Sequence, residues 1–550
     1  MISVLLSPAK KDRLRDRGMT VSLASCRFLT GALGTILPLA AQTSVLTSHN
    51  DVARTGLNPL ETILTPANVN SSNFGKLFFT KLDGKVDAQP LYVPGVSIPN
   101  AGTHNVLIAV TEHDSIYALD ADNGAVLWRS TALLAGEAPS DSRNCNQIIP
   151  EIGITSTPVI NDQTTPMLIY LVAMSKDRSG NYHQRLHALD INSGREQLGG
   201  PVNIQAKYPG SGENSQGGYV IFDPAQYAAR AGLLLGPGNT TVYIAWTSHC
   251  DIRPYTGWIL GYSASDLSQT TVLNTTPNGS EGAFWGSGSG VAADPATGSI
   301  FIMAGNGTFD TALNSQGFPA NGDFGNAFLN ISTANNTLQV ADYFNMSNTV
   351  AESDADVDLG SGGVLVLPDL RDSSGTVWHL AVGAGKDANI YLVNRDNMGK
   401  FNPNSNDAIY QDITGALGGP VFSMPAWFNG QIYYGAVGDS LKAFPFSGAT
   451  LSSTPSSQTS LKFSFPGTTS SISANGSTNG IVWAVENKSP DAVLHAYLAS
   501  NLASELYNSS SKSLRDRFGP GNKFITPTIV NGKVYVGTPT GVVAFGLLPR

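Results

Sequence analysis

The sequence predicts an all-β protein, an eight-bladed β-propeller that is closed by an N-terminal strand. Three observations support this fold class: a turn-rich composition, a strand pattern that repeats about eight times, and a last repeat that lacks one strand. Only 13% of the 550 residues are charged, whereas 58 are Gly and 31 are Pro. This composition favours short strands joined by many turns over long helices with paired surface charges.

Residues 1–42 have the features of a signal peptide. Six Lys and Arg residues lie within 10–27, an apolar stretch follows at 28–39, and the small residues Ala40 and Ala41 suit cleavage by a peptidase. The apolar stretch is shorter than the ~20 residues that a membrane span requires, and no other apolar run approaches that length. We therefore expect an exported protein, periplasmic or extracellular, without a membrane span.

Two alternatives stay open for this N-terminal region. Met19 could be the true start, because the first 18 residues add little to the targeting signal. The sequence from Leu23 to Cys26 is similar to a lipoprotein box, but an apolar stretch should precede that cysteine, and here it follows.

The charge of the chain excludes one class of partner. Removal of residues 1–42 takes away six basic and two acidic residues, so that the formal net charge falls from −9 to about −13. An acidic chain without a basic stripe argues against nucleic acid and against an anionic membrane surface. We expect a monomer that binds a small molecule, a carbohydrate or a protein at one face.

The repeat is clearest in its first copy. A strand at 88–93 with a central Pro90 leads into a very apolar strand at 105–110 and a third strand at 115–120. The pair Asn123-Gly124 then marks a tight turn before an outer strand at 125–128. Apolar residues alternate with period two within these strands, which is typical of a sheet.

Later copies of the pattern continue to the end of the chain. They make about eight units of roughly 50–70 residues, the size of four-stranded propeller blades. The expected openings of these copies lie near 154–158, 217–222, 288–293, 359–367, 419–421, 470–474 and 524–527.

The last copy predicts how the ring closes. It ends after its third strand, at 542–545, and would leave an exposed sheet edge. A strand at 76–82 precedes the first copy and belongs to no blade. Pairing of these two strands would complete the eighth blade. The expected organisation is therefore an N-terminal extension at 43–75 and a single eight-bladed propeller at 76–550.

The unit at 118–128, with the sequence Ala-Leu-Asp-Ala-Asp-Asn-Gly-Ala-Val-Leu-Trp, resembles the repeat of the quinoprotein family, the propellers that bind pyrroloquinoline quinone. The resemblance extends over most of the chain at the level of the repeat, and implies the propeller fold. The same repeat occurs in quinone-free relatives, such as the periplasmic propeller that assists outer-membrane assembly. It therefore specifies the fold better than the chemistry.

Within this resemblance, three residues correspond to functional positions of the family. Asn306, in Ala304 to Gly307, is similar to the asparagine that binds calcium. Asp323, in Asn321 to Asn326, is similar to the catalytic aspartate, and Lys386 to the basic residue that touches the quinone. Two departures oppose the match, since no two cysteines are adjacent and no Glu lies near 176–178, where the family has a calcium ligand.

The connections that share one rim of a propeller collect most of the unusual polar residues. Connections between the second and third strands of a blade lie on the same face as those from one blade to the next, and propeller sites form where such loops converge. These polar residues are Glu112, His113, Cys145, Glu151, 176–178, 249–251, 306–323, 354–358, Lys386 and Asp387.

Several of these residues have two interpretations. Asp356 and Asp358 alternate, with Asp354, as calcium ligands in loops do, or they form the solvated start of a strand. Trp285 stacks under a planar ligand or packs between blades. His249 and Asp251 form an acid–base pair or support the local structure.

Cys145 and Cys250 are expected to form a disulfide. Both lie outside the signal peptide, an exported chain reaches an oxidising compartment, and both fall on the same rim.

Two classes of function follow. One is a quinoprotein-like propeller with degenerate cofactor motifs that presents a loop-rich polar face for ligand or protein binding. The alternative is a dehydrogenase of alcohols or sugars that depends on pyrroloquinoline quinone and calcium. The missing adjacent cysteines and the missing Glu favour the first.

Overall fold

The computed structural model describes residues 43–549. The expected signal peptide at 1–42 lies outside these described residues. Over these residues the fold is all-β, with only two short α-helices, α1 (Thr349–Asp354) and α2 (Ser513–Asp516). None of the helices in residues 43–549 has the length and apolar character that a membrane crossing requires.

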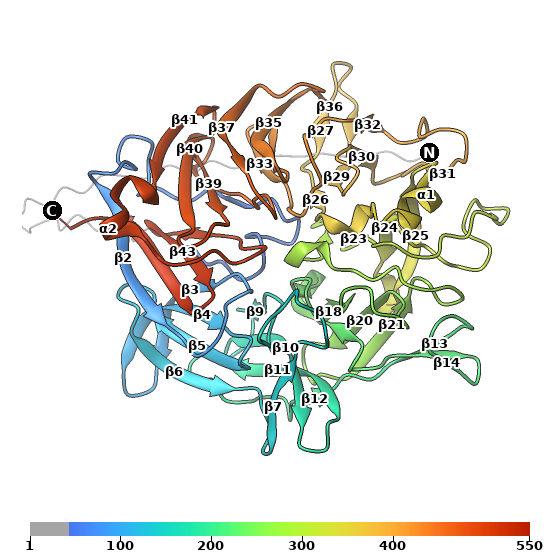
Figure 1. The fold of residues 1–550 in the computed structure, drawn as a ribbon, viewed down its shortest axis with the longest axis horizontal. Coiled ribbons are helices and arrows are strands. Elements are labelled where there is room, and N and C mark those ends of the chain that lie inside the picture. Colours follow the sequence, from blue (N-terminus) through green and yellow to red (C-terminus); the bar gives the residue numbers. More distant parts are fainter. Residues whose placement is uncertain (1–42, 550) are drawn as a thin grey trace, which may run out of the picture. The chain divides into compact units, whose positions relative to one another are not determined.

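Eight sheets of at least four strands follow one another along the described residues, and we number them 1 to 8 (Figure 1). Sheet 1 contains β3 (Leu91–Ile98), β4 (Gly102–Val110), β5 (Ser115–Asp120) and β6 (Val126–Thr131). Sheet 2 contains β9 (Val159–Asn161), β10 (Leu168–Asp177), β11 (Tyr182–Asp190) and β12 (Val202–Asn203), with β7 (Glu137–Asp141) and β8 (Glu151–Ile152) attached. Sheet 3 contains β17 (Leu234–Leu235), β18 (Thr241–Ala245), β20 (Trp258–Ser263) and β21 (Gln269–Asn274).

Sheets 4 to 6 repeat this antiparallel order. Sheet 4 contains β22 (Ala292–Ala293), β23 (Ile300–Met303), β24 (Phe328–Ser332), β25 (Gln339–Asn345) and, parallel to β25, β31 (Lys400–Phe401). Sheet 5 contains β26 (Leu365–Val366), β29 (Leu380–Ala384), β30 (Ile390–Asn394) and β32 (Gln411–Ile413). Sheet 6 contains β33 (Ala426–Phe428), β34 (Gln431–Gly435), β35 (Asp439–Ser447), β36 (Thr450–Leu451) and β37 (Ser457–Phe463).

Sheets 7 and 8 each include a strand from the N-terminal region. Sheet 7 contains β38 (Ser471–Asn475), β39 (Thr478–Glu486), β40 (Val493–Leu498), β41 (Asn501–Asn508) and, parallel to β38, β1 (Leu57–Asn58). Sheet 8 contains β42 (Thr528–Val530), β43 (Lys533–Thr538), β44 (Gly541–Leu547) and β2 (Phe74–Lys81).

The pairing of β2 with β44 is antiparallel, from Phe74 opposite Leu547 to Lys81 opposite Gly541. It confirms the predicted contact between the strand at 76–82 and the strand at 542–545, and gives the last sheet its fourth strand.

One expected opening was wrong. Residues 217–222 do not begin sheet 3, whose first strand is β17. They contribute instead to a small sheet of β13 (Lys207–Pro209), β14 (Ser215–Gln216) and β15 (Tyr219–Ile221). The Gly217-Gly218 turn followed by apolar residues imitates the start of a repeat. The remaining pairs are β16 (Tyr227–Ala228) with β19 (Thr247–Ser248) and β27 (Leu370–Arg371) with β28 (Val377–Trp378).

The core lies between neighbouring sheets. Apolar clusters join sheet 2 to 3, 3 to 4, 4 to 5, 5 to 6, 6 to 7 and 7 to 8. A further cluster joins sheet 8, through Val530 and Tyr535, to residues of sheets 1 and 2. Each sheet therefore buries both of its faces against its neighbours, which explains why its strands are apolar on both sides.

Residues 45–58, here called the central segment, touch the first strand of every sheet or the residue beside it. Backbone hydrogen bonds of 2.7–2.9 Å join Val45 to Tyr92 in β3, Leu46 to Ile160 in β9, Val52 to Ala293 in β22, Ala53 to Val366 in β26, Thr55 to Trp427 in β33 and Gly56 to Ile472 in β38. Side chains complete the set, since Arg54 donates to Leu233 before β17 and Asn58 to Ile529 in β42.

Arg54 is a fully buried charged residue of this segment, with 0% of its surface exposed. Its guanidinium donates to the carbonyl oxygens of Val291 at 2.9 Å, Ser48 at 2.6 Å and Leu233 at 3.1 Å. Burial lowers the pKa of Arg54 to about 10, so that it remains protonated at neutral pH. The N-terminal extension expected at 43–75 is thus tied into sheets 3 and 4 by a buried cation.

We expect Arg54→Met to lower the free energy of unfolding by about 3–5 kcal/mol, because several buried carbonyl oxygens lose their donor. Guanidinium denaturation measures the change. Arg178→Met is the matched control, since Arg178 is exposed and makes no hydrogen bond with the described residues. A loss below about 1 kcal/mol for Arg54→Met would show that the segment is not structural.

Candidate ligand-binding site

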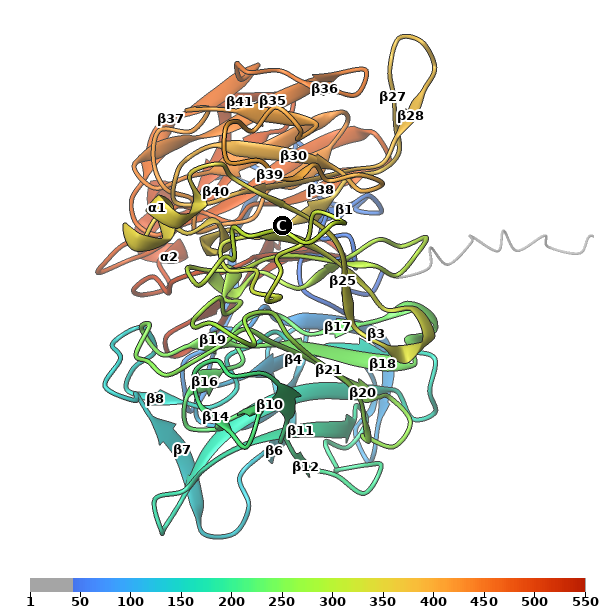
Figure 2. The ribbon, with the colours of Figure 1, turned by 90° about the vertical axis from the view of Figure 1, so that its right-hand side faces the viewer.

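A cavity of about 490 Å³ lies among the connections between strands and is the candidate site. Its lining comes from at least seven separate connections, and Figure 2 shows the nearby elements β8, β16, β19 and α1 on one side of the ribbon. Functionally relevant lining residues are Cys145, Gln147, Arg230, Ser248, His249, Cys250, Asp251, Trp285, Asp356, Lys386, Phe422, Phe465 and Phe524.

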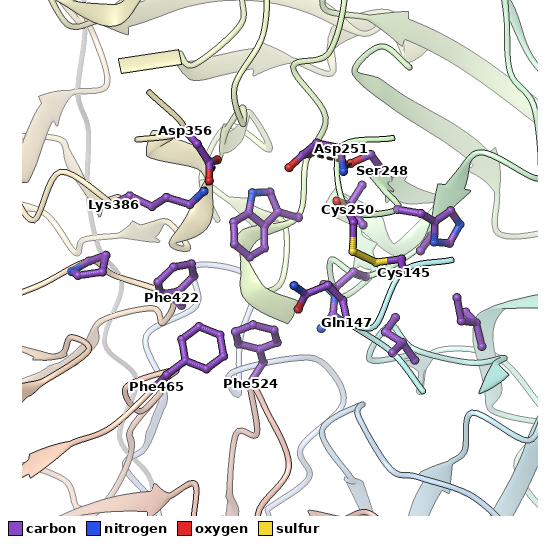
Figure 3. A pocket seen from close by; sticks show the side chains of 18 residues that line it. Cys145, Gln147, Ser248, Cys250, Asp251, Asp356, Lys386, Phe422, Phe465 and Phe524 are labelled. Atoms are coloured by element: carbon purple, nitrogen blue, oxygen red, sulfur yellow. Dashed lines mark hydrogen bonds and ion pairs between the residues drawn. A yellow bond between two sulfur atoms is a disulfide. The ribbon is translucent and has the colours of Figure 1, made fainter. Parts of the chain in front are cut away.

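The disulfide forms part of the cavity wall (Figure 3). Cys145 and Cys250 are bonded, with their Cα atoms 5.6 Å apart, which confirms the predicted pair. Cys145 lies between β7 and β8, and Cys250 lies just after β19. The bond therefore ties an extension of sheet 2 to a loop of sheet 3.

Four aromatic side chains line another part of the cavity. The Trp285 ring lies 5.7 Å from Phe422 and 6.4 Å from Phe524, and Phe465 lies 5.3 Å from Phe422 and 6.2 Å from Phe524. These centroid distances are those of interacting aromatic pairs. The rings give the cavity an apolar wall on which a flat molecule can stack.

An adjoining hollow holds Lys386 between two carboxylates. The Lys386 ammonium is 2.5 Å from Asp356 Oδ1 and 2.8 Å from Asp358 Oδ1. Trp285 Nε1 donates to Asp358 Oδ2 at 2.7 Å, and Asn306 Nδ2 donates to Asp356 Oδ1 at 2.8 Å. Five residues selected from the sequence thus meet here, from four different connections.

The electrostatics of this group follow from its burial. Asp358 exposes only 2% of its surface, and burial raises its pKa although Lys386 opposes that change. Burial by itself disfavours the charged form of Lys386, but the two carboxylates outweigh it and raise the pKa of Lys386. The ammonium also lies 5.7 Å from the centre of the Trp285 ring.

The oxygen atoms of this group suit a hard cation. Asn306 Oδ1 is buried and has no hydrogen-bond partner among the described residues. With the carboxylates of Asp356 and Asp358 it offers the oxygen donors that calcium prefers. Within residues 43–549, no cluster of three or more His, Cys, Asp or Glu side chains has the arrangement of a metal site. The carboxylates alone therefore do not make a calcium site. A calcium ion here would also need the Asn306 Oδ1 atom and further oxygen atoms from a bound ligand.

Asp323 is not brought into this group. It does not line the cavity or the adjoining hollow, and it is buried where Asn278 N donates to its carboxylate at 2.9 Å. His249 and Asp251 line the cavity without pairing. Asp251 accepts instead from Ser248 Oγ at 3.0 Å and from the Tyr255 hydroxyl at 2.9 Å, which corrects the acid–base interpretation.

Six of the lining residues named above were missed in the sequence, among them Gln147 and Ser248. Phe422, Phe465 and Phe524 lie in connections whose position at the mouth only the fold reveals. Arg230 carried a signal, because it is the one charged residue in the apolar run from Tyr227 to Leu235. A lone charge in a buried run requires a partner or a function.

We expect Asp323→Asn to act on stability through pH. Burial raises the pKa of Asp323 from 3.8 to about 6, so the folded state binds its proton more tightly than the unfolded state does. Asp323 therefore lowers the free energy of unfolding progressively as pH rises from about 4 to 6, and the full cost remains above pH 6. The variant should therefore gain more melting temperature relative to the parent at pH 7.5 than at pH 4.5. An equal difference at both values contradicts this.

No family model and no curated protein sequence matches the chain. Solved structures do. The chain is similar to the quinohemoprotein alcohol dehydrogenase of Comamonas testosteroni, with TM-score 0.59 and 14% identity over 93% of this chain and 82% of that one. A quinohemoprotein alcohol dehydrogenase of Pseudomonas putida HK5 is similar with TM-score 0.58 and 13% identity, over 92% of this chain and 82% of that one.

A europium-containing methanol dehydrogenase gives TM-score 0.58 and 11% identity, over 92% of this chain and 98% of that chain. At such low identity the likeness concerns the fold alone. In its architecture, the chain has the β-propeller fold of the quinoprotein alcohol dehydrogenases.

Proposed function

We propose that the eight sheets are the blades of a closed β-propeller and that the cavity is the ligand site at its mouth. Three features support closure: the apolar clusters between successive sheets, the cluster between sheets 8 and 1, and the β2–β44 pairing. The central segment adds a contact to each blade. A closed ring holds loops from different blades in fixed positions, which suits a binding site.

The ligand we propose is a planar aromatic small molecule with anionic groups, of the quinone class. The observation that carries this is the lining of the cavity, because the Trp285 and Phe rings offer a stacking wall and the Cys145–Cys250 disulfide forms another wall. The volume of about 490 Å³ is within the range of small-molecule sites. The quinoprotein names of the similar structures agree with this ligand class.

The residues present fit pyrroloquinoline quinone with calcium. Asn306 and Asp356 would hold calcium, and Lys386 and Trp285 would contact the quinone. When bound, the pair would supply a Lewis acid and an acceptor of two electrons. The disulfide lies in the same cavity as Trp285, so this chain provides sulfur at the site although its cysteines are not adjacent.

A second candidate function is oxidation of an alcohol or a sugar. Asp358 favours it, because this carboxylate is buried beside the unpartnered Asn306 Oδ1 and is fixed by Trp285 and Lys386. A carboxylate whose pKa is raised by burial is suited to take the proton of a substrate hydroxyl, and Asp358 Oδ1 would do so. Asp358, and not Asp323, is therefore our candidate base.

We further propose that the protein is exported and acts in the periplasm or outside the cell. Its support is the disulfide, since such bonds persist in oxidising compartments.

Titration with pyrroloquinoline quinone and calcium chloride tests the binding site, with quenching of tryptophan fluorescence as the measure of binding. We expect Trp285→Ala to weaken binding about 10-fold or more, because stacking on an aromatic ring is worth ~1–3 kcal/mol. Trp378→Ala is the control, since Trp378 packs on Tyr410 outside the cavity. Equal affinity for both variants and the parent, or no binding by the parent, contradicts the proposal.

The enzyme candidate requires its own test. With quinone and calcium bound, the parent should reduce an artificial dye in the presence of an alcohol or a sugar. Asp358→Asn should lower this rate by about 100-fold or more, as expected for loss of a general base, while quinone affinity is retained. Absence of dye reduction across alcohols and sugars removes the dehydrogenase candidate and leaves the binding function.

A further inference from the structure

Arg230 is a buried cation without a partner. It lies between β16 and β17, lines the cavity, and exposes 7% of its surface. Among the described residues 43–549, its guanidinium makes no hydrogen bond or ion pair, and only the more distant charges of Asp87 and Glu112 act on it. A buried guanidinium is costly to desolvate and is normally matched by an acceptor or a carboxylate. Arg230 therefore lacks the anion that its position requires.

The two acids whose charges act on Arg230, Asp87 and Glu112, are already engaged. Asp87 lies 3.1 Å from Lys85 Nζ and accepts from Asn522 Nδ2 at 2.7 Å. Glu112 Oε2 accepts from Gly153 N at 2.8 Å. Burial and the charge of Asp87 raise the pKa of Glu112 well above its usual value, which favours its neutral form. Neither acid neutralises Arg230 by direct contact.

A second cation lies beside the same aromatic ring. Arg230 Cζ is 5.0 Å and Lys523 Nζ 5.9 Å from the centre of the Phe524 ring. Lys523 Nζ donates to Gln147 Oε1 at 2.8 Å, and Gln147 lines the cavity. Burial, with the positive charges of Arg230 and Lys85, lowers the pKa of Lys523 to about 8. Positive charge is thus in excess here.

The group around Lys386, in the adjoining hollow, has an excess of negative charge instead. There the single ammonium of Lys386 meets the two carboxylates of Asp356 and Asp358. The aromatic wall of Trp285, Phe422 and Phe524 connects the two groups. The cavity therefore has one group with unmatched positive charge and one rich in carboxylates.

We propose that Arg230, assisted by Lys523, is an anion subsite of this cavity and binds a carboxylate carried by an aromatic ring of the ligand. The planar guanidinium can donate two parallel hydrogen bonds to a carboxylate, and the attached ring can stack on the neighbouring aromatic wall. This inference rests on the proposed function, since it assigns the anionic end of the planar ligand. It names aromatic carboxylates as the ligand class.

Calorimetric titration with benzene-1,3,5-tricarboxylate and with its trimethyl ester tests the subsite in the full protein. The parent should bind the acid at least about 10-fold more tightly than the ester, because charge-assisted hydrogen bonds are roughly twice as strong as neutral ones. Arg230→Gln should remove this preference by weakening the acid alone. Arg230→Lys should give an intermediate affinity, and the exposed control Arg178→Gln should leave both affinities unchanged.

The melting temperature without ligand separates binding from a structural role. Arg230→Gln removes an uncompensated buried charge, so the variant should melt at the same or a higher temperature than the parent. A clearly lower melting temperature would assign Arg230 to the fold and overturn the subsite. Equal affinity of the parent and Arg230→Gln for the acid, or no binding of the acid by the parent, also overturns it.

The outcomes also separate this inference from the proposed function. If the acid and the ester bind equally and Trp285→Ala weakens both, the planar-ligand site is supported and the anion subsite is contradicted. If the affinity for the acid falls in Arg230→Gln but not in Trp285→Ala, the anion subsite is supported and stacking on the aromatic wall is contradicted.

Discussion

The contacts of the central segment hold the whole arrangement together. Fourteen consecutive residues, 45–58, bond to the first strands of eight sheets or beside them, and buried Arg54 links sheets 3 and 4 through the carbonyl oxygens of Leu233 and Val291. A propeller blade contacts mainly its two neighbours, so errors in its position can accumulate around a ring. A segment that touches every blade removes this freedom. The cavity depends on that constraint, because its lining comes from the connections of many blades.

The cavity combines two electrostatic environments along one aromatic wall. Asp356 and Asp358 hold the Lys386 ammonium, whereas Arg230 has no anion. In a low-dielectric site each charge is expensive unless it is matched, so unmatched groups indicate what a ligand must supply. Arg230 requires an anion, and the unpartnered Asn306 Oδ1 accepts a cation or a donor. A carboxylate of a flat ligand would satisfy the first demand, and a calcium ion bound with the ligand would satisfy the second.

The sequence predicted the features that depend on local pattern or on simple counting. Period-two alternation and Asn-Gly turns identified the strands of sheet 1, and the missing strand of the last repeat identified β2 as its partner. The disulfide followed because only Cys145 and Cys250 remain after residues 1–42. Asn306, Asp356, Asp358, Lys386 and Trp285 were selected from loops that share one rim, and the fold brings them together.

Other features required the fold. The central segment bonds to strands as much as 471 residues away, the farthest through the Asn58 side chain, and leaves no periodic pattern in the sequence. Asp323 has the local Gly-Asp sequence of a catalytic residue, but its loop folds against Asn278 and away from the cavity. Conversely, Asp358 sits in an ordinary acidic run, and only its burial beside Trp285 distinguishes it from Asp354.

Hydrogen exchange of individual backbone amides tests the central claim, that one segment fixes the positions of all eight sheets. The amides of Ile160, Ala293, Val366, Trp427 and Ile472 donate to the central segment from five different sheets. Because a buried segment shared by all blades must open cooperatively, all five should exchange as slowly as amides in the middle strands, and all five should lose protection together in Arg54→Met. Loss confined to Ala293, which lies in the sheet next to Arg54, with the other four amides unchanged, would contradict the account.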